Sequence, residues 1–145
     1  MFRRSSGTKH DEADTTAIGV LRDNLAGLVE DARRAGAKVA IGTFAHGLNE
    51  AGAPDVFSDD ERTLGVPAVG RWFENLGPQG ARRSFPVYNS MIRSLAHDYA
   101  IPLAEPAKRV PKTPEYLTDW CHFTAKGEQL MAQLWFEAVE AAGWL

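Results

Sequence analysis

The chain has 145 residues, 44% of them hydrophobic and 24% charged, and this composition favours one small globular domain over a disordered chain. The net charge is −3, and lysine and arginine cluster at most in pairs, which excludes the basic footprint of a nucleic-acid-binding or anionic-membrane-binding protein. A single cysteine, Cys121, excludes an internal disulfide and a zinc site built from several cysteines.

The sequence also lacks the signals of membrane insertion and export. No stretch approaches the roughly 20 apolar residues that a membrane-spanning helix needs, and the first residues lack the apolar core of an export signal. We therefore expect no membrane span. A cytoplasmic location is favoured for the chain as given, although an export signal would be lost together with any missing N-terminal portion.

The first predicted element is an amphipathic helix from Thr15 or Thr16 to Ala35. Its apolar positions recur at spacings of three and four, and they are Ile18, Leu21, Leu25, Leu28, Val29 and Ala32. Gly36 follows where a left-handed cap ends a helix, and residues 38–44 form a short apolar run typical of a buried strand. Helix, glycine and buried strand in this order indicate an α/β protein.

Residues 45–84 interrupt this pattern, because glycine and proline are scattered throughout the segment. Within it, residues 58–61 have the spacing of a capping box, and the apolar residues of 69–76 have the spacing of a short helix. A loop of this length in a small domain is often functional. The segment is predicted to be an insertion, either a lid over a substrate or a surface feature held down by its aromatic residues.

Regular structure is predicted to return with an amphipathic helix over residues 85–100 and a second strand over 101–106, where Pro102 favours the start or an edge. After a loop, a last helix begins with Thr124 as its N-cap and ends at Gly143. The two strands are expected to be parallel and joined by a right-handed crossover. Since parallel sheets are normally larger, the first strand is expected to leave an unpaired edge, with the front strands of the fold missing.

The residues with the clearest catalytic pattern are Asp119 and His122. A carboxylate three residues before a histidine, in the turn that precedes a helix, can fold back on the imidazole Nδ1 and leave Nε2 facing a cleft. This is the orienting and general-base half of a catalytic triad. The alternative is that Asp119 only caps a turn and His122 is half-buried.

Five other side chains are weaker candidates. His46 follows the first strand and is expected to be solvated, or else to line the same cleft, while His97 is expected to face water. Cys121 is expected to act as a small buried hydrophobe rather than a thiolate. A zinc site made from His46, Asp119, Cys121 and His122 has no spacing motif to support it. Trp120 and Phe123 are expected to pack the last helix on the sheet, with an apolar wall for a substrate as the alternative.

Residues 118–127, with the sequence TDWCHFTAKG, resemble the C-terminal block of SGNH (GDSL-type) hydrolases, as do Tyr88-Asn89 and residues 101–105 before it. Residues 24–43 are similar to that family's approach to its fourth strand. The resemblance implies a partial flavodoxin-like three-layer α/β fold, one domain over 1–145, and ester hydrolysis through a serine. It carries His122 over as the general base and Asp119 as its orienting group, and it implies no cofactor and no metal.

The family's Gly-Asp-Ser block is absent from the sequence. Ser5 and Ser6 are not preceded by a strand, and Lys9 occupies the position of the asparagine in the family's Gly-x-Asn-Asp block. We therefore predict a truncated hydrolase of small-molecule esters, of the serine esterase, lipase or acylesterase type, with little or no activity until a serine-bearing segment completes it. The alternative is a non-catalytic binding or assembly module that uses the exposed sheet edge and the insertion to form an oligomer or hold a partner.

Overall fold

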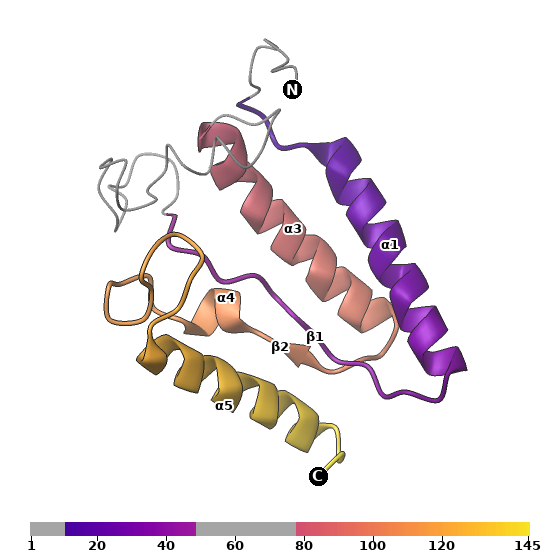
Figure 1. Ribbon diagram of the computed structural model, residues 1–145. Helices are drawn as coiled ribbons and strands as arrows, with labels where there is room; N and C mark the ends of the chain where they lie inside the picture. Colours follow the sequence, from indigo (N-terminus) through magenta and orange to yellow (C-terminus); the bar gives the residue numbers. More distant parts are fainter. Residues whose placement is uncertain (1–10, 49–77) are drawn as a thin grey trace, which may run out of the picture.

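The computed structural model describes residues 11–48 and 78–145 (Figure 1). The elements in chain order are α1 (Thr15–Arg34), β1 (Ile41–Gly42), α3 (Pro78–Asp98), β2 (Leu103–Ala104), α4 (Pro106–Arg109) and α5 (Ala125–Ala141). The two strands pair in parallel, with Ile41 opposite Leu103 and Gly42 opposite Ala104. The described part of the chain is therefore mainly helical around a small parallel sheet, which agrees with a partial α/β class.

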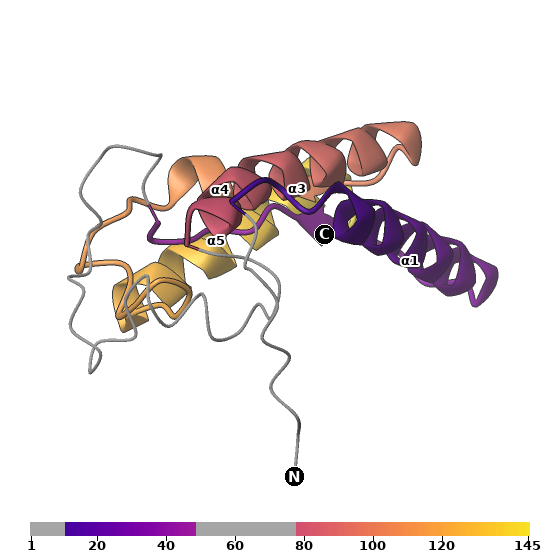
Figure 2. The same cartoon turned by 90° about the horizontal axis from the view of Figure 1, so that it is seen from above.

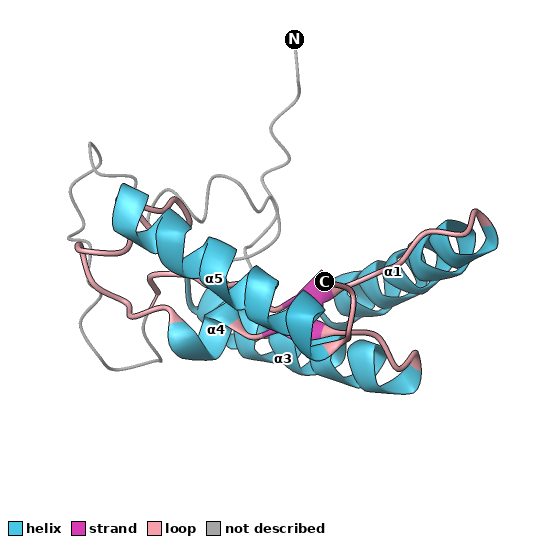
Figure 3. Ribbon diagram, turned by 90° about the horizontal axis from the view of Figure 1, so that it is seen from below, coloured by secondary structure: helices cyan, strands magenta, loops and turns pink. Residues whose placement is uncertain are grey.

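Helices cover both faces of this sheet because successive residues of a strand point to opposite sides. Ile41 and Leu103 pack with Ile18 of α1 and with residues of α3. On the other face, α5 packs so closely that a Cβ atom on Gly42 would lie 2.7 Å from the ring of Trp135. Figure 2 shows α1 and α3 together on the first face, and Figure 3 shows α5 across the second.

Helix α1 has the bounds that the sequence predicts to within one residue. Asp14 caps its first turn, with a carboxylate oxygen 2.9 Å from the backbone nitrogen of Ala17, and Gly36 adopts a left-handed φ of 80° after its end. Val29 is buried as predicted, but Leu28 is 64% exposed. The prediction that Leu28 belongs to the packed face is wrong, because α3 covers only one side of the apolar stripe of α1.

Helix α3 begins at Pro78, so the prediction of an insertion that extends to residue 84 is wrong for residues 78–84. Pro78 and Gly80 suggested irregular structure, yet the helix includes both. The first turns are stabilised by long-range packing, because Ala81 and Phe85 are buried in a cluster with Leu48 and Trp120. The predicted capping box at 58–61 and the predicted short helix at 69–76 lie outside the described residues.

The strands are much shorter than the extended segments predicted at 38–44 and 101–106. A strand is defined by its pairing, and within the described residues each strand has one neighbour. Extended backbone continues past the strand ends, since the backbone nitrogen of Thr43 lies 3.1 Å from the carbonyl oxygen of Ala104. The short helix α4 was not predicted, and it begins at Pro106, where a proline loses no hydrogen bond.

The carboxyl ends of β1 and β2 point to the same end of the molecule, where most of the polar side chains discussed below lie (Figure 1). Glu105, directly after β2, accepts hydrogen bonds from Arg93 of α3 and from Lys108 of α4. The Arg93 guanidinium is the main reason that the pKa of the Glu105 carboxyl falls to about 2. In the described part of the chain, no helix is long and apolar enough to cross a membrane.

Candidate functional site

The segment between α4 and α5 forms a tight loop at the carboxyl end of β2. An antiparallel bridge joins Leu117 and Phe123, and the backbone nitrogen of Thr118 donates to the carbonyl of His122 at 2.9 Å. Helix α5 then starts after Thr124, the N-cap that the sequence predicts, whose hydroxyl accepts from the backbone nitrogen of Gly127. The loop therefore has a fixed shape, and it presents residues 119–122 at its tip.

Asp119 and His122 come together as the sequence predicts. Nδ1 of His122 lies 2.7 Å from Oδ2 of Asp119, while Oδ1 of Asp119 accepts the backbone N–H groups of Cys121 and His122, both at 2.8 Å. The carboxylate is buried and the His122 side chain is 69% exposed. Because an ionised Asp119 can only accept, Nδ1 carries the proton and Nε2 is left with a lone pair. That is the tautomer of a general base.

The environment of Asp119 favours its ionised form. Burial alone acts to raise the pKa of the carboxyl, but the backbone N–H of Cys121 and the side chain and backbone N–H of His122 outweigh it, so the pKa is lowered overall. The carboxylate is consequently charged at neutral pH and can stabilise an imidazolium on His122. The alternative considered from the sequence, that Asp119 only caps a turn beside a half-buried His122, is partly correct. Asp119 does cap this turn, but His122 is exposed.

Cys121 lies nearer to the histidine than expected, because its Sγ is 3.5 Å from Nδ1 of His122. The side chain is half-buried against the cluster around Leu48 and Trp120, so the prediction of a small packed hydrophobe is confirmed only in part. Burial, followed by the negative charge of Asp119, raises the pKa of the thiol to about 11. The sulfur is therefore protonated at neutral pH and is a poor nucleophile.

The side chains of Asp119, Cys121 and His122 offer three potential metal ligands within 4.8 Å of one another. His46, the fourth member of the zinc site considered from the sequence, is not part of this group. The carboxylate already accepts three hydrogen bonds, including the one from Nδ1. A metal ion bound through Nδ1 of His122 would replace its hydrogen bond to Asp119, which the structure shows formed at 2.7 Å.

Trp120 and Phe123 act as packing residues. Trp120 is buried with its ring centroid 6.1 Å from that of Phe85, on α3, whereas Phe123 packs with Leu134 of α5. The carbonyl of Trp120 also accepts from the backbone nitrogen of Gly47 at 2.8 Å. This bond fastens the segment after β1 to the loop that carries Asp119 and His122.

His46 is not solvated, and that prediction is wrong. The residue is only 9% exposed, and its ring stacks on Phe85 with a centroid distance of 4.5 Å. Burial, and then the charge of Lys112, lowers the pKa of His46 to about 4, against an opposing effect of the Leu48 carbonyl. His97, by contrast, has a side chain that is 91% exposed, as predicted.

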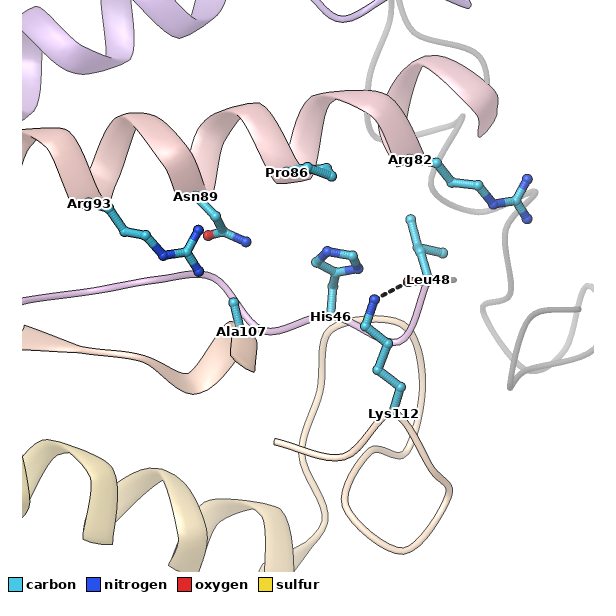
Figure 4. A pocket seen from close by; sticks show the side chains of 8 residues that line it. All are labelled: His46, Leu48, Arg82, Pro86, Asn89, Arg93, Ala107 and Lys112. Atoms are coloured by element: carbon cyan, nitrogen blue, oxygen red, sulfur yellow. Dashed lines mark hydrogen bonds between the residues drawn. The ribbon is translucent and has the colours of Figure 1, made fainter. Parts of the chain in front are cut away.

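His46 lines a cavity of about 240 Å³ beside α3, which Figure 4 shows from close by. Arg82, Arg93 and Lys112 supply positive charge around it. Asn89 of α3 holds the adjoining backbone, because its amide oxygen accepts from the nitrogen of Phe44 at 2.7 Å and its amide nitrogen donates to the carbonyl of Phe44 at 3.0 Å. The sequence analysis missed this cavity. The available signal was that His46 and Lys112 both follow the carboxyl ends of parallel strands.

A nucleophile for His122 is not found among the described residues. The serines of this part of the chain, Ser84, Ser90 and Ser94, all lie on α3, and the Ser84 hydroxyl donates to the carbonyl of Gly80 at 2.7 Å. Ser5, Ser6 and Lys9, which the sequence analysis considered, lie outside the described residues. No family model, no curated protein and no solved structure matches the chain. The interpretation of the site therefore depends on its geometry.

Proposed function

We propose that the chain carries the general-base half of a serine hydrolase that acts on ester bonds, of the SGNH type and with a flavodoxin-like arrangement of its sheet. The single observation that supports this most is the 2.7 Å contact between Nδ1 of exposed His122 and Oδ2 of buried Asp119. Its position beyond the carboxyl end of β2 agrees with the usual place of active sites in parallel α/β sheets.

In this mechanism Nε2 of His122 removes the proton from a serine hydroxyl as its oxygen attacks the ester carbonyl. The imidazolium, stabilised by Asp119, then gives the proton to the departing alcohol as the acyl–enzyme forms. A water molecule, activated by the same Nε2, releases the acid and restores the serine. Within the described residues no serine hydroxyl is hydrogen-bonded to His122, so the proposal takes the hydroxyl from outside them, from this chain or from another one.

The test is hydrolysis of a short-chain aryl ester by the purified protein and three variants. We expect His122→Ala to lower kcat/KM by at least about 100-fold and Asp119→Asn to lower it substantially, because general-base catalysis contributes roughly 10²–10⁴-fold. His97→Ala is the matched control, since it removes an exposed histidine from the last turn of α3 and should retain the full rate. A phosphonate that reacts with activated serines, followed by mass spectrometry, would locate the nucleophile.

Two outcomes would contradict the proposal. Equal rates in all four proteins, above the uncatalysed background, would remove His122 from the chemistry, and so would a loss of activity in the His97→Ala variant of the same size as that in His122→Ala. Circular dichroism of each variant is required beside the kinetics, because Asp119 also caps the loop through two backbone bonds.

A second candidate function is that of an assembly module, and it is supported by the open side of the fold. Within the described residues β1 pairs only with β2, and α1 exposes the apolar side chains of Val20 and Leu28. An unpaired strand edge beside apolar surface is a common docking place for a further strand or a second copy. This candidate predicts a stable oligomer with no turnover, whereas the hydrolase predicts turnover that depends on His122.

A further inference from the structure

The cavity beside His46 has the features of a binding site in its own right. Its volume of about 240 Å³ is smaller than the roughly 300–1,000 Å³ of a typical small-molecule site, so it fits a small chemical group rather than a whole substrate. It lies at the carboxyl end of β1, between α3 and the loop after α4. Figure 4 shows Asn89 and Arg93 approaching it from α3 and Lys112 rising toward His46 from the loop.

Among the described residues, the charged side chains that line the cavity are all cationic. They are Arg82, Arg93 and Lys112, and none of the described lining residues is acidic. Arg93 is partly neutralised by its two-pronged contact with Glu105, at 2.9 and 3.1 Å from its Nε. Lys112 lies close enough to influence the protonation of His46, and it donates to the carbonyl of Leu48 at 2.7 Å. The electrostatic field in the cavity therefore favours a negatively charged group.

The wall of the cavity also contains a polar atom that lacks a partner. His46 is more than nine-tenths buried, and its Nδ1 has no hydrogen-bond partner among the described residues. A buried polar group without a partner is destabilising, so such atoms are rare unless a ligand or water completes them. The imidazole can supply one N–H donor to an anion that also contacts the cations.

We propose that this cavity binds a small oxyanion group, a carboxylate or a phosphate, through Lys112, the arginines at its rim and the imidazole of His46. The group belongs to an ester substrate that carries a negative charge, and this second part depends on the proposed hydrolase function. One backbone hydrogen bond connects the cavity to the catalytic pair, because the nitrogen of Gly47, next to His46, donates to the carbonyl of Trp120, next to Asp119, at 2.8 Å. Binding at His46 therefore takes place on a segment fastened to the loop of Asp119 and His122.

The first experiment measures binding of inorganic phosphate, and separately of succinate, by isothermal titration in a sulfonate buffer without other oxyanions. We expect saturable binding at one site, with an affinity at least tenfold weaker in Lys112→Gln. Arg34→Gln is the matched control, since it removes one positive charge from an exposed position at the end of α1 and should change the affinity less than twofold. His46→Phe keeps the stacking on Phe85 and should weaken binding without unfolding the protein.

The relative affinities for the two anions identify the source of the charged group. Tighter binding of phosphate indicates a phosphorylated ester, and tighter binding of succinate indicates a carboxylated one. Absence of saturable binding for both anions would overturn the proposal. It would also fall if Arg34→Gln weakened binding as much as Lys112→Gln does. Thermal melts of each variant show whether a loss of affinity comes from a loss of folding.

The second experiment compares hydrolysis of a neutral aryl acetate with that of an aryl hemisuccinate. We expect Lys112→Gln to raise the KM for the charged ester at least fivefold and to leave the neutral one unchanged. If anions bind but His122→Ala does not affect hydrolysis, the anion site is supported and the hydrolase function is refuted. If His122→Ala abolishes hydrolysis but no anion binds, the hydrolase stands and the anion site fails.

Discussion

At the scale of single residues, His46 and His97 show that the burial of a histidine depends on segments far away in the sequence. Both histidines stand alone in the sequence, one in a loop rich in glycine and one on a helix. The first lies under Phe85 with its pKa lowered to about 4, and the second is almost fully exposed. This difference depends on α3, which approaches His46 from about 40 positions along the chain, so that spacing within the loop could not reveal it.

The low pKa of His46 predicts that the protein loses stability in mild acid. The unfolded chain takes up a proton near the ordinary pKa of 6.5 and the folded chain only near 4. The stability contributed by neutral His46 is therefore complete above pH 6.5 and decreases as the pH falls toward 4. Between pH 7 and pH 5 the free energy of unfolding should fall by about 1–2 kcal/mol from this residue.

Urea denaturation at several pH values, in a buffer free of phosphate and carboxylates, measures this effect. The His46→Phe variant should show a flatter dependence on pH across that interval, and His97→Ala should keep the dependence of the parent protein. If His46→Phe were as sensitive to acid as the parent, then another group would be the source of the slope.

Asp119 and His122 are the opposite case, because their contact could be predicted from the sequence. Because Asp119 and His122 are three positions apart in one turn, their side chains come together whatever the rest of the fold does. The hydrogen bond between them is formed as expected. The nearness of Cys121 to the same ring was not predicted, since it depends on how the loop is pressed against Leu48 and Phe85. Local spacing thus specifies the pair but not its surroundings.

At the scale of elements, the helices were easier to predict than the strands. The caps of α1 and α5, Asp14 with Gly36 and then Thr124, are local signals that act within one turn. The strands depend on partners far away in the sequence, which explains why apolar runs of six or seven residues contain only two paired residues each. The early start of α3 has the same origin, because Ala81 is buried by residues from other segments.

Gly127, in the first turn of α5, lies against the loop that carries Asp119 and His122, and it provides a sharp test of this packing. A Cβ atom there would lie 2.1 Å from the carbonyl oxygen of Tyr116, which is backbone and cannot move aside cheaply. We expect Gly127→Ala to lower the free energy of unfolding by at least about 2 kcal/mol, since overpacking against a fixed wall is strongly destabilising. Chemical denaturation measures the change.

Gly19 of α1 is the control for this substitution. It is also a helical glycine, but a Cβ atom there would meet nothing within 4 Å. Gly19→Ala should therefore stabilise the protein by about 0.5–1 kcal/mol, the ordinary gain from replacing an exposed glycine in a helix. If both variants had the same effect, the close packing of Gly127 on Tyr116 would be refuted.

At the scale of the whole molecule, the order of elements and the parallel pairing agree with the sequence analysis. The paired part of the sheet is smaller than predicted. Within residues 11–48 and 78–145, the buried side chains form four small clusters rather than one continuous core. One of them joins α1 and α3 to Ile41 and Leu103, and another joins α5 to the segments after β1 and β2. Neither reaches the far side of α1, where Val20 and Leu28 remain exposed.

This exposed side of α1 predicts that a second copy of the chain covers it in solution. Burying a leucine side chain contributes roughly 1.5–3 kcal/mol, so a charge at Leu28 should raise the dissociation constant of a dimer at least tenfold. Sedimentation velocity over a range of concentrations should show association in the parent protein and a monomer in Leu28→Glu. The thermal stability of that monomer should be nearly unchanged, because Leu28 contributes little to the core.

Phe136→Glu on α5 distinguishes a specific interface from non-specific hydrophobic association. Phe136 is also an exposed apolar residue, but α5 lies on the opposite face of the sheet from α1. It should leave the association intact. A parent protein that stays monomeric at all concentrations would exclude the dimer, and equal weakening by the two variants would mean that the contact is not centred on α1. With the dimer confirmed, the aryl ester assay on Leu28→Glu would show whether the second copy supplies the serine hydroxyl of the proposed hydrolase.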